Sequence, residues 1–198
     1  MNKASRLVAW VGVFALLLPL SGCTTAPHKE GVPGNAEKLR EFLDRGVGAN
    51  TQEVADAYVN SAGAGQQQFV ELLLHRGVDL ESRGTCDTSR TAWMKESGSF
   101  SGVTALMCAA ANGETQIVGL LLQRGADANA NAQEFRKKWT ALHFAVFFDH
   151  SQVAKQLLDS GAEDVRGPLA LAREVDRSSG MIHLLEQAAE LQLGTERK

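Results

Sequence analysis

The sequence predicts an all-α fold made of repeated helix pairs. A double leucine followed by a glycine turn recurs along the chain, most clearly at Leu121–Gly125 and Leu157–Gly161. Ahead of the first of these, Ile117, Val118 and Leu121 have the spacing that places apolar side chains on one face of a helix. One such pair cannot bury its own apolar face. Neighbouring copies are therefore expected to stack and to share a core.

A short motif opens the clearest copy. Residues 140–145 are Thr-Ala-Leu-His-Phe-Ala, and residues 104–109 and 167–170 keep part of the same pattern. This motif resembles the Thr-Pro-Leu-His-x-Ala signature of the ankyrin repeat, which has a period of ~33 residues. The resemblance covers most of residues 36–190. It implies an ankyrin-repeat solenoid of about four to five helix-turn-helix repeats, the terminal ones degenerate, that acts as a binding protein and not as an enzyme.

Individual residues within the repeats have predicted structural roles. Thr104 and Thr140 stand where a hydroxyl would cap the start of a helix. Gly125 and Gly161 stand where a helix ends in a left-handed conformation. His143 is expected to form a hydrogen bond at a helix start and not to bind a metal ion.

One interval between repeats is too long. The distance from Gly77 to Gly125 exceeds the ~33-residue period by about fifteen residues. We therefore expect an insertion at about 84–101, in the long loop that joins two repeats. Insertions of this kind lie on one face of a repeat array, which is often the binding face. Residues 98–102, rich in glycine and serine, are predicted to be a flexible loop.

The amino terminus resembles a bacterial lipoprotein signal. Two cations, Lys3 and Arg6, precede an apolar run that is too short to span a membrane comfortably and contains Pro19. The run ends in Leu20-Ser21-Gly22-Cys23, which resembles a lipobox. The resemblance implies cleavage before Cys23 and covalent lipid on its sulfur. The alternative is an uncleaved amino-terminal anchor.

The predicted organisation follows from these segments. It comprises a signal peptide at 1–22, a flexible tether at 23–34, an ankyrin-repeat domain at 35–192 and a tail at 193–198. The resemblance to lipoproteins implies a bacterial cell-envelope protein that faces the periplasm. Thr24 favours the outer membrane, because in that family an aspartate at this position retains the protein in the inner membrane.

Charge and cysteine content limit the remaining possibilities. The net charge of the chain is −3, and loss of residues 1–22 removes two cations and no carboxylate, which leaves −5. This charge does not favour nucleic acid, which is usually bound by a basic patch. Cys86 and Cys108 form either a disulfide, which an exported location permits, or two separate thiols.

No catalytic or metal-binding constellation is present in the sequence. The five histidines are scattered, and residues 98–102 fail as a nucleophile elbow because Phe100 occupies the position that serine would need. We expect no catalytic residue, no metal ligand, no small-molecule substrate and no cofactor other than the lipid on Cys23.

A protein partner is the expected ligand, bound by aromatic and charged residues in the loops. These residues come from the insertion, the next loop and the end of the following helix: Trp93, Lys95, Phe100, Phe135, Arg136, Lys137, Lys138, Trp139, Phe148, Asp149 and His150. Alternatives remain for some of them. Trp139 is equally suited to the core, and the basic run at 136–138 is equally suited to a solvated loop. The insertion that holds Trp93 and Phe100 could instead fold back over the stack and cover it.

Three functions are compatible with this sequence. The first is an envelope scaffold or adaptor, including one that supports a periplasmic enzyme. The second is an immunity protein that inhibits a toxin acting in the periplasm, which the acidic mature charge favours. The third and least favoured is an enzyme.

Overall fold

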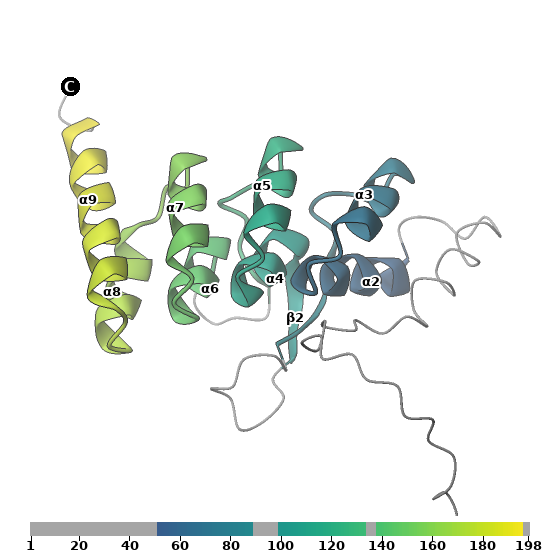
Figure 1. Ribbon diagram of the computed structural model, residues 1–198, viewed down its shortest axis with the longest axis horizontal. Helices are drawn as coiled ribbons and strands as arrows, with labels where there is room; N and C mark the ends of the chain where they lie inside the picture. Colours follow the sequence, from purple (N-terminus) through teal and green to yellow (C-terminus); the bar gives the residue numbers. More distant parts are fainter. Residues whose placement is uncertain (1–50, 89–98, 134–137, 196–198) are drawn as a thin grey trace, which may run out of the picture. The chain divides into compact units, whose positions relative to one another are not determined.

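Eight helices and two strands make up the part of the chain that the computed structural model describes, which is residues 51–88, 99–133 and 138–195 (Figure 1). All of them lie in the compact unit Gly31–Lys198. The helices form consecutive pairs: α2 (Gln52–Gly63) with α3 (Gln67–His75), α4 (Ala105–Asn112) with α5 (Thr115–Gln123), α6 (Ala141–Phe147) with α7 (Ser151–Asp159), and α8 (Arg166–Glu174) with α9 (Ser179–Thr195). The strands are β1 (Arg83–Asp87) and β2 (Ser99–Thr104).

The helix pairs pack on one another in chain order. The first helices, α2, α4, α6 and α8, each contact the next, and so do the second helices α5, α7 and α9. In α4, Ala109, Ala110 and Ala111 have no exposed surface. Because these side chains are small, the backbones of α2 and α6 can approach α4 closely from either side.

The second helix of each pair closes the core over the first. In α5, Ile117, Val118 and Leu121 are buried, which confirms the predicted apolar face. The chain then turns at Gly125, whose φ is +91°, and Gly161 after α7 has a φ of +92°. Both glycines therefore adopt the left-handed conformation expected at these positions.

The threonine caps are also confirmed. The Thr104 hydroxyl accepts a hydrogen bond from the Met107 backbone N–H at 3.4 Å. Thr140 and His143 form a reciprocal capping box, in which the Thr140 backbone N–H donates to His143 Nδ1 at 3.2 Å. His143 is thus a helix-start hydrogen-bonding residue.

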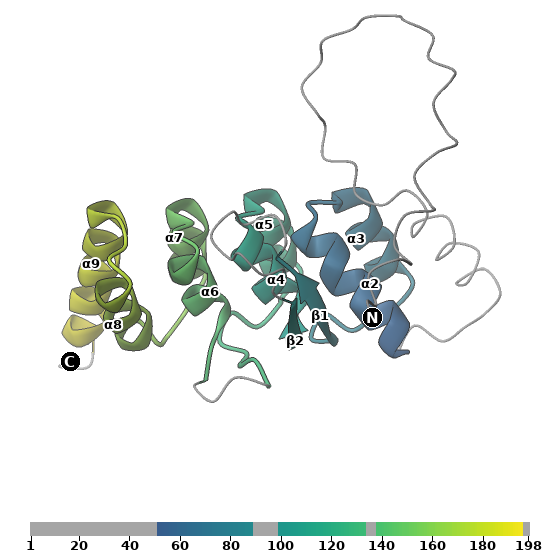
Figure 2. The same cartoon turned by 90° about the horizontal axis from the view of Figure 1, so that it is seen from below.

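The insertion departs from the all-α prediction. β1 and β2 pair in an antiparallel hairpin beside α2 and α4, so the segment 98–102 that we predicted to be a flexible loop is largely part of a strand (Figure 2). The physical reason is non-local. The backbone N–H groups of Thr85 and Asp87 donate to side chains of α2, at 2.7 Å to Asp56 Oδ1 and 3.0 Å to Asn60 Oδ1. A helix therefore satisfies one edge of the small sheet.

Two helices add detail to the sequence expectation. α2 lies within the predicted repeat domain, although no signature motif marked its position; Thr51 caps its start, and Val54, Tyr58 and Ala62 are buried at helical spacing. α9 continues to Thr195, into the segment predicted to be a tail. Among the described residues, no helix is both long enough and apolar enough to cross a bilayer.

Candidate protein-binding site

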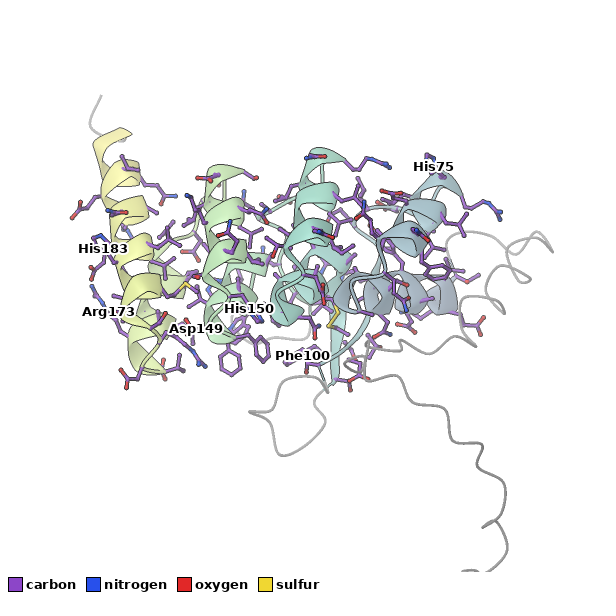
Figure 3. All side chains as sticks on the ribbon, viewed as in Figure 1. His75, Phe100, Asp149, His150, Arg173 and His183 are labelled. Atoms are coloured by element: carbon purple, nitrogen blue, oxygen red, sulfur yellow. A yellow bond between two sulfur atoms is a disulfide. The ribbon has the colours of Figure 1, made fainter. Side chains whose placement is uncertain are left out.

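Five aromatic side chains meet beside the hairpin, and we call them the aromatic cluster: Phe100, Trp139, Phe144, Phe147 and Phe148. Phe100 comes from β2, Trp139 precedes α6, and the others belong to α6 or follow it directly. Figure 3 labels Phe100 at the lower edge of the helices. The rings of Phe144 and Phe148 from the next repeat pack against it. Two successive repeats therefore build this cluster together.

The rings pack in the geometries that aromatic pairs prefer. The Phe100 ring centroid lies 5.4 Å from that of Phe144 and 6.3 Å from that of Phe148, both in edge-to-face arrangements. Trp139 lies 5.2 Å from Phe144 and 5.4 Å from Phe147. Phe144 is 1% exposed and anchors the cluster, while the other four rings are only half-buried. The cluster thus has a fixed base and an apolar surface that solvent reaches.

A third repeat contributes a cation. The guanidinium carbon of Arg177 lies 5.6 Å from the centre of the Phe147 ring, within the range of a cation–π interaction. Its Nε atom is buried and has no hydrogen-bond partner among the described residues. Arg177 thus adds a cation to the aromatic cluster from the repeat that contains α8 and α9.

Several of the predicted partner-binding residues are brought together here. Phe100, Trp139 and Phe148 are members of the aromatic cluster, and Lys138 is exposed next to Trp139. Asp149 is exposed, has a φ of +61°, and accepts a hydrogen bond from Ser178 Oγ at 2.9 Å. Trp139 packs on the core and also keeps part of its surface exposed. It is therefore compatible with both roles that the sequence left open, in the core and in partner binding.

His150 makes a contact that the sequence did not predict. Its Nε2 lies 3.1 Å from the Ala111 carbonyl oxygen at the end of α4, so it connects two repeats. Burial lowers the pKa of His150 below the ordinary 6.5, against the opposing effects of this hydrogen bond and of Asp149 and Glu114. This contact gives His150 a structural role, and its predicted role in partner binding stays a prediction. No local pattern indicated the contact, because the acceptor belongs to the preceding repeat.

The remaining predicted residues lie outside the described part of the chain. They are Cys23 and its lipobox, Trp93 and Lys95 in the insertion, and Phe135, Arg136 and Lys137 before α6. Their assignments stay predictions.

The two cysteines of the domain are joined. Cys86 of β1 and Cys108 of α4 form a disulfide with an S–S distance of 2.01 Å and a Cα–Cα distance of 5.5 Å. Each residue is 1% exposed. Of the two alternatives that the sequence left open, the structure contains the bridge.

The aromatic cluster and Arg177 form the candidate binding surface among the described residues. Within residues 51–88, 99–133 and 138–195, no three metal-ligating side chains gather at one point. The arrangement that stands out is an apolar, cation-bearing edge spanning three repeats, which is the type of surface that concentrates binding energy between proteins. The fold defines a helical repeat protein, and this surface is its candidate protein-binding site.

Comparison with known families agrees with this class. The family described as ankyrin repeats (3 copies) matches residues 32–131 and 62–166, and the chain belongs to that family. Ankyrin repeats serve in protein–protein interaction in general, and the family is typically not enzymatic. Among curated proteins, none matches this chain.

Proposed function

We propose that this protein is a lipid-anchored ankyrin-repeat solenoid of the bacterial cell envelope, and that it binds a protein partner through the aromatic cluster. The observation that carries the proposal is the meeting of Phe100, Trp139 and Phe148 on one surface beside Arg177. Aromatic and arginine side chains dominate binding energy at protein interfaces, particularly where an apolar centre is surrounded by polar residues.

The location of the cluster supports a role in recognition. Its rings come from an insertion strand and from the neighbouring repeat, so a partner that contacts it touches features that distinguish this chain from a regular ankyrin array. The rigid base at Phe144 reduces the conformational entropy that the half-buried rings would lose on binding.

The amino-terminal sequence supports the envelope location. Acylation of Cys23 would hold the domain at a membrane surface, and more than one acyl chain is needed for firm attachment. The disulfide between Cys86 and Cys108 agrees with an exported protein, because such bonds persist mainly in oxidising compartments.

The surface is tested by affinity capture from a detergent-solubilised envelope. Phe148→Ala should reduce recovery of the partner at least tenfold, since truncation of a central aromatic residue typically costs ~2 kcal/mol or more. Leu191→Ala is the matched control, because Leu191 is a large apolar residue that is 73% exposed and belongs to α9. Equal loss in both variants, or in neither, would refute the assignment of the aromatic cluster.

The anchor is tested separately. Cys23→Ala should abolish incorporation of labelled fatty acid and leave the precursor uncut, whereas Cys86→Ala should leave labelling unchanged. Normal acylation of the Cys23 variant would contradict the lipobox.

The identity of the captured partner separates the two binding functions. A resident envelope protein would indicate a scaffold or adaptor. A secreted toxin, particularly one encoded beside this chain, would indicate an immunity protein, which the net charge of −5 after loss of residues 1–22 also favours. Turnover of a small substrate by the purified domain, without a protein partner, would refute both.

A further inference from the structure

The disulfide lies where it can hold one member of the aromatic cluster, Phe100, in position. Cys86 lies directly opposite Phe100 in the register of the hairpin, so the bond to Cys108 holds the strand position that faces this ring. Phe100 is also the only described residue through which the hairpin contributes to the aromatic cluster. Figure 3 shows the sulfur–sulfur bond beside the hairpin, between the strands and α4.

The non-covalent contacts that hold the hairpin come from α2, from its base and, through Phe100, from the rings of the next repeat. Thr85 and Asp87 in β1 donate to α2, and the Arg83 guanidinium donates to the Gly102 carbonyl at 3.1 Å. The ladder is irregular between Gly84 and Cys86. A two-stranded hairpin is marginally stable in water by itself, and β2 is rich in serine and glycine. This part of the chain therefore depends on what ties it to the repeats.

The surroundings of the two sulfur atoms fit the bonded state. A Cβ atom on Gly63 would lie 2.5 Å from Cys108 Sγ, so the absence of a side chain there leaves room for the sulfur against α2. Asn112 Nδ2 donates to the Cys108 carbonyl at 3.0 Å and lies 3.7 Å from Cys86 Sγ and 3.8 Å from Cys108 Sγ. α2, α4 and β1 thus enclose the bond together.

We infer that oxidation of Cys86 and Cys108 is the covalent modification that completes the partner-binding surface, because it ties the hairpin to α4 and keeps Phe100 within the aromatic cluster. In this step each thiol loses a proton and an electron, and the Sγ–Sγ bond forms. A protein disulfide or a low-molecular-weight disulfide is the oxidant and is reduced to two thiols. The consequence for partner binding rests on the proposed function, whereas the consequence for the hairpin does not.

The test is hydrogen exchange on the full chain, purified with its bond intact and again after reduction by dithiothreitol. Reduction should lower the amide protection of Ser99–Thr104 by on the order of tenfold or more, because removing the cross-link makes local opening easier. Protection in α7 and α9 should stay the same and serves as the internal control. Reoxidation with glutathione disulfide should restore the hairpin.

The double variant Cys86→Ala/Cys108→Ala provides the second measurement. The amides of Ser99–Thr104 should exchange in this variant at the rate seen in the reduced protein. Neither dithiothreitol nor glutathione disulfide should change that rate. Unchanged protection of the hairpin after complete reduction, measured by a thiol count, would overturn the inference. An equal loss of protection in α7 and α9 would overturn it as well, because the bond would then support the whole fold. Failure to capture any partner would refute the proposed function and leave these outcomes unaffected.

Discussion

The pair α4–α5 and the hairpin β1–β2 lie against each other, and they are stabilised by different kinds of interaction. In α4–α5, a hydroxyl cap, a glycine turn and an apolar face at helical spacing all lie within about one ~33-residue repeat. In the hairpin, the decisive contacts come from α2, from a disulfide and from rings of the following repeat. The structure of a regular repeat therefore depends on residues within that repeat, whereas the structure of the insertion depends on contacts with its neighbours.

The largest expected effect comes from the core of the regular repeat. Leu121→Ala should lower the free energy of unfolding by ~2–5 kcal/mol, since Leu121 has no exposed surface and its removal leaves a cavity. Urea denaturation followed by circular dichroism measures this change. A loss below about half a kcal/mol would show that α5 does not depend on this residue.

The next largest loss of stability is expected from a substitution of Gly113, the glycine that ends α4. Gly113 has a φ of +74°, and a Cβ atom there would lie 2.7 Å from His150 Nδ1. Gly113→Ala should therefore cost ~2–4 kcal/mol, from the left-handed backbone and from the clash with a ring held between repeats.

Gly125 is the matched control for this substitution. Its φ is +91°, and a Cβ atom would have nothing within 4 Å. Gly125→Ala should cost ~1–2 kcal/mol from backbone strain alone. Equal costs at the two positions would show that the contact between His150 and the preceding repeat does not constrain Gly113.

A smaller effect concerns the hairpin edge. Asp56→Ala removes the acceptor of the Thr85 N–H and should cost ~1–2 kcal/mol, a value reduced by partial solvent access. Hydrogen exchange should locate the loss in Arg83–Asp87. Asp56→Asn keeps an oxygen acceptor and should retain most of the protection, so a full loss in that variant would show that charge matters more than the hydrogen bond.

The smallest expected effect is a pH dependence from His150. Because its pKa is lower in the folded protein than the ordinary 6.5, the unfolded chain binds more protons in the interval between the two values. The contribution of His150 to the free energy of unfolding is therefore fully present above about pH 6.5, and it is lost as the pH falls through the folded-state pKa. Urea denaturation at about pH 7.5 and about pH 5.5 should show this decrease in the wild type and a smaller one in His150→Gln.

Local signals accounted for much of the fold. The caps at Thr104 and Thr140, the turn at Gly125 and the buried face of α5 were all predicted, because each depends on residues a few positions apart. Phe100 and Trp139 were singled out by residue type in predicted loops, and Phe148 at the predicted end of a helix. Their meeting in one cluster was not predicted, because Phe100 belongs to the insertion and the other two belong to the following repeat.

What the sequence left out has a physical cause. The hairpin and the contact of His150 with Ala111 both depend on partners in another repeat, and no signature motif marked the bounds of α2. In the hairpin, serine and glycine gave the appearance of a flexible loop, and nothing local indicated that Asp56 and Asn60 would satisfy the edge of β1. The choice between a disulfide and two thiols was open for the same reason, since sequence does not report a Cα–Cα distance.

The sequence by itself determined the repeated helix pairs, their caps and turns, and the types of residue available for binding, because helix periodicity and capping act over one or two turns. Only the tertiary structure decided that Cys86 reaches Cys108, that Phe100 joins the rings of the next repeat, and that His150 connects two repeats. These contacts join segments far apart along the chain, and stacking of the repeats brings them together.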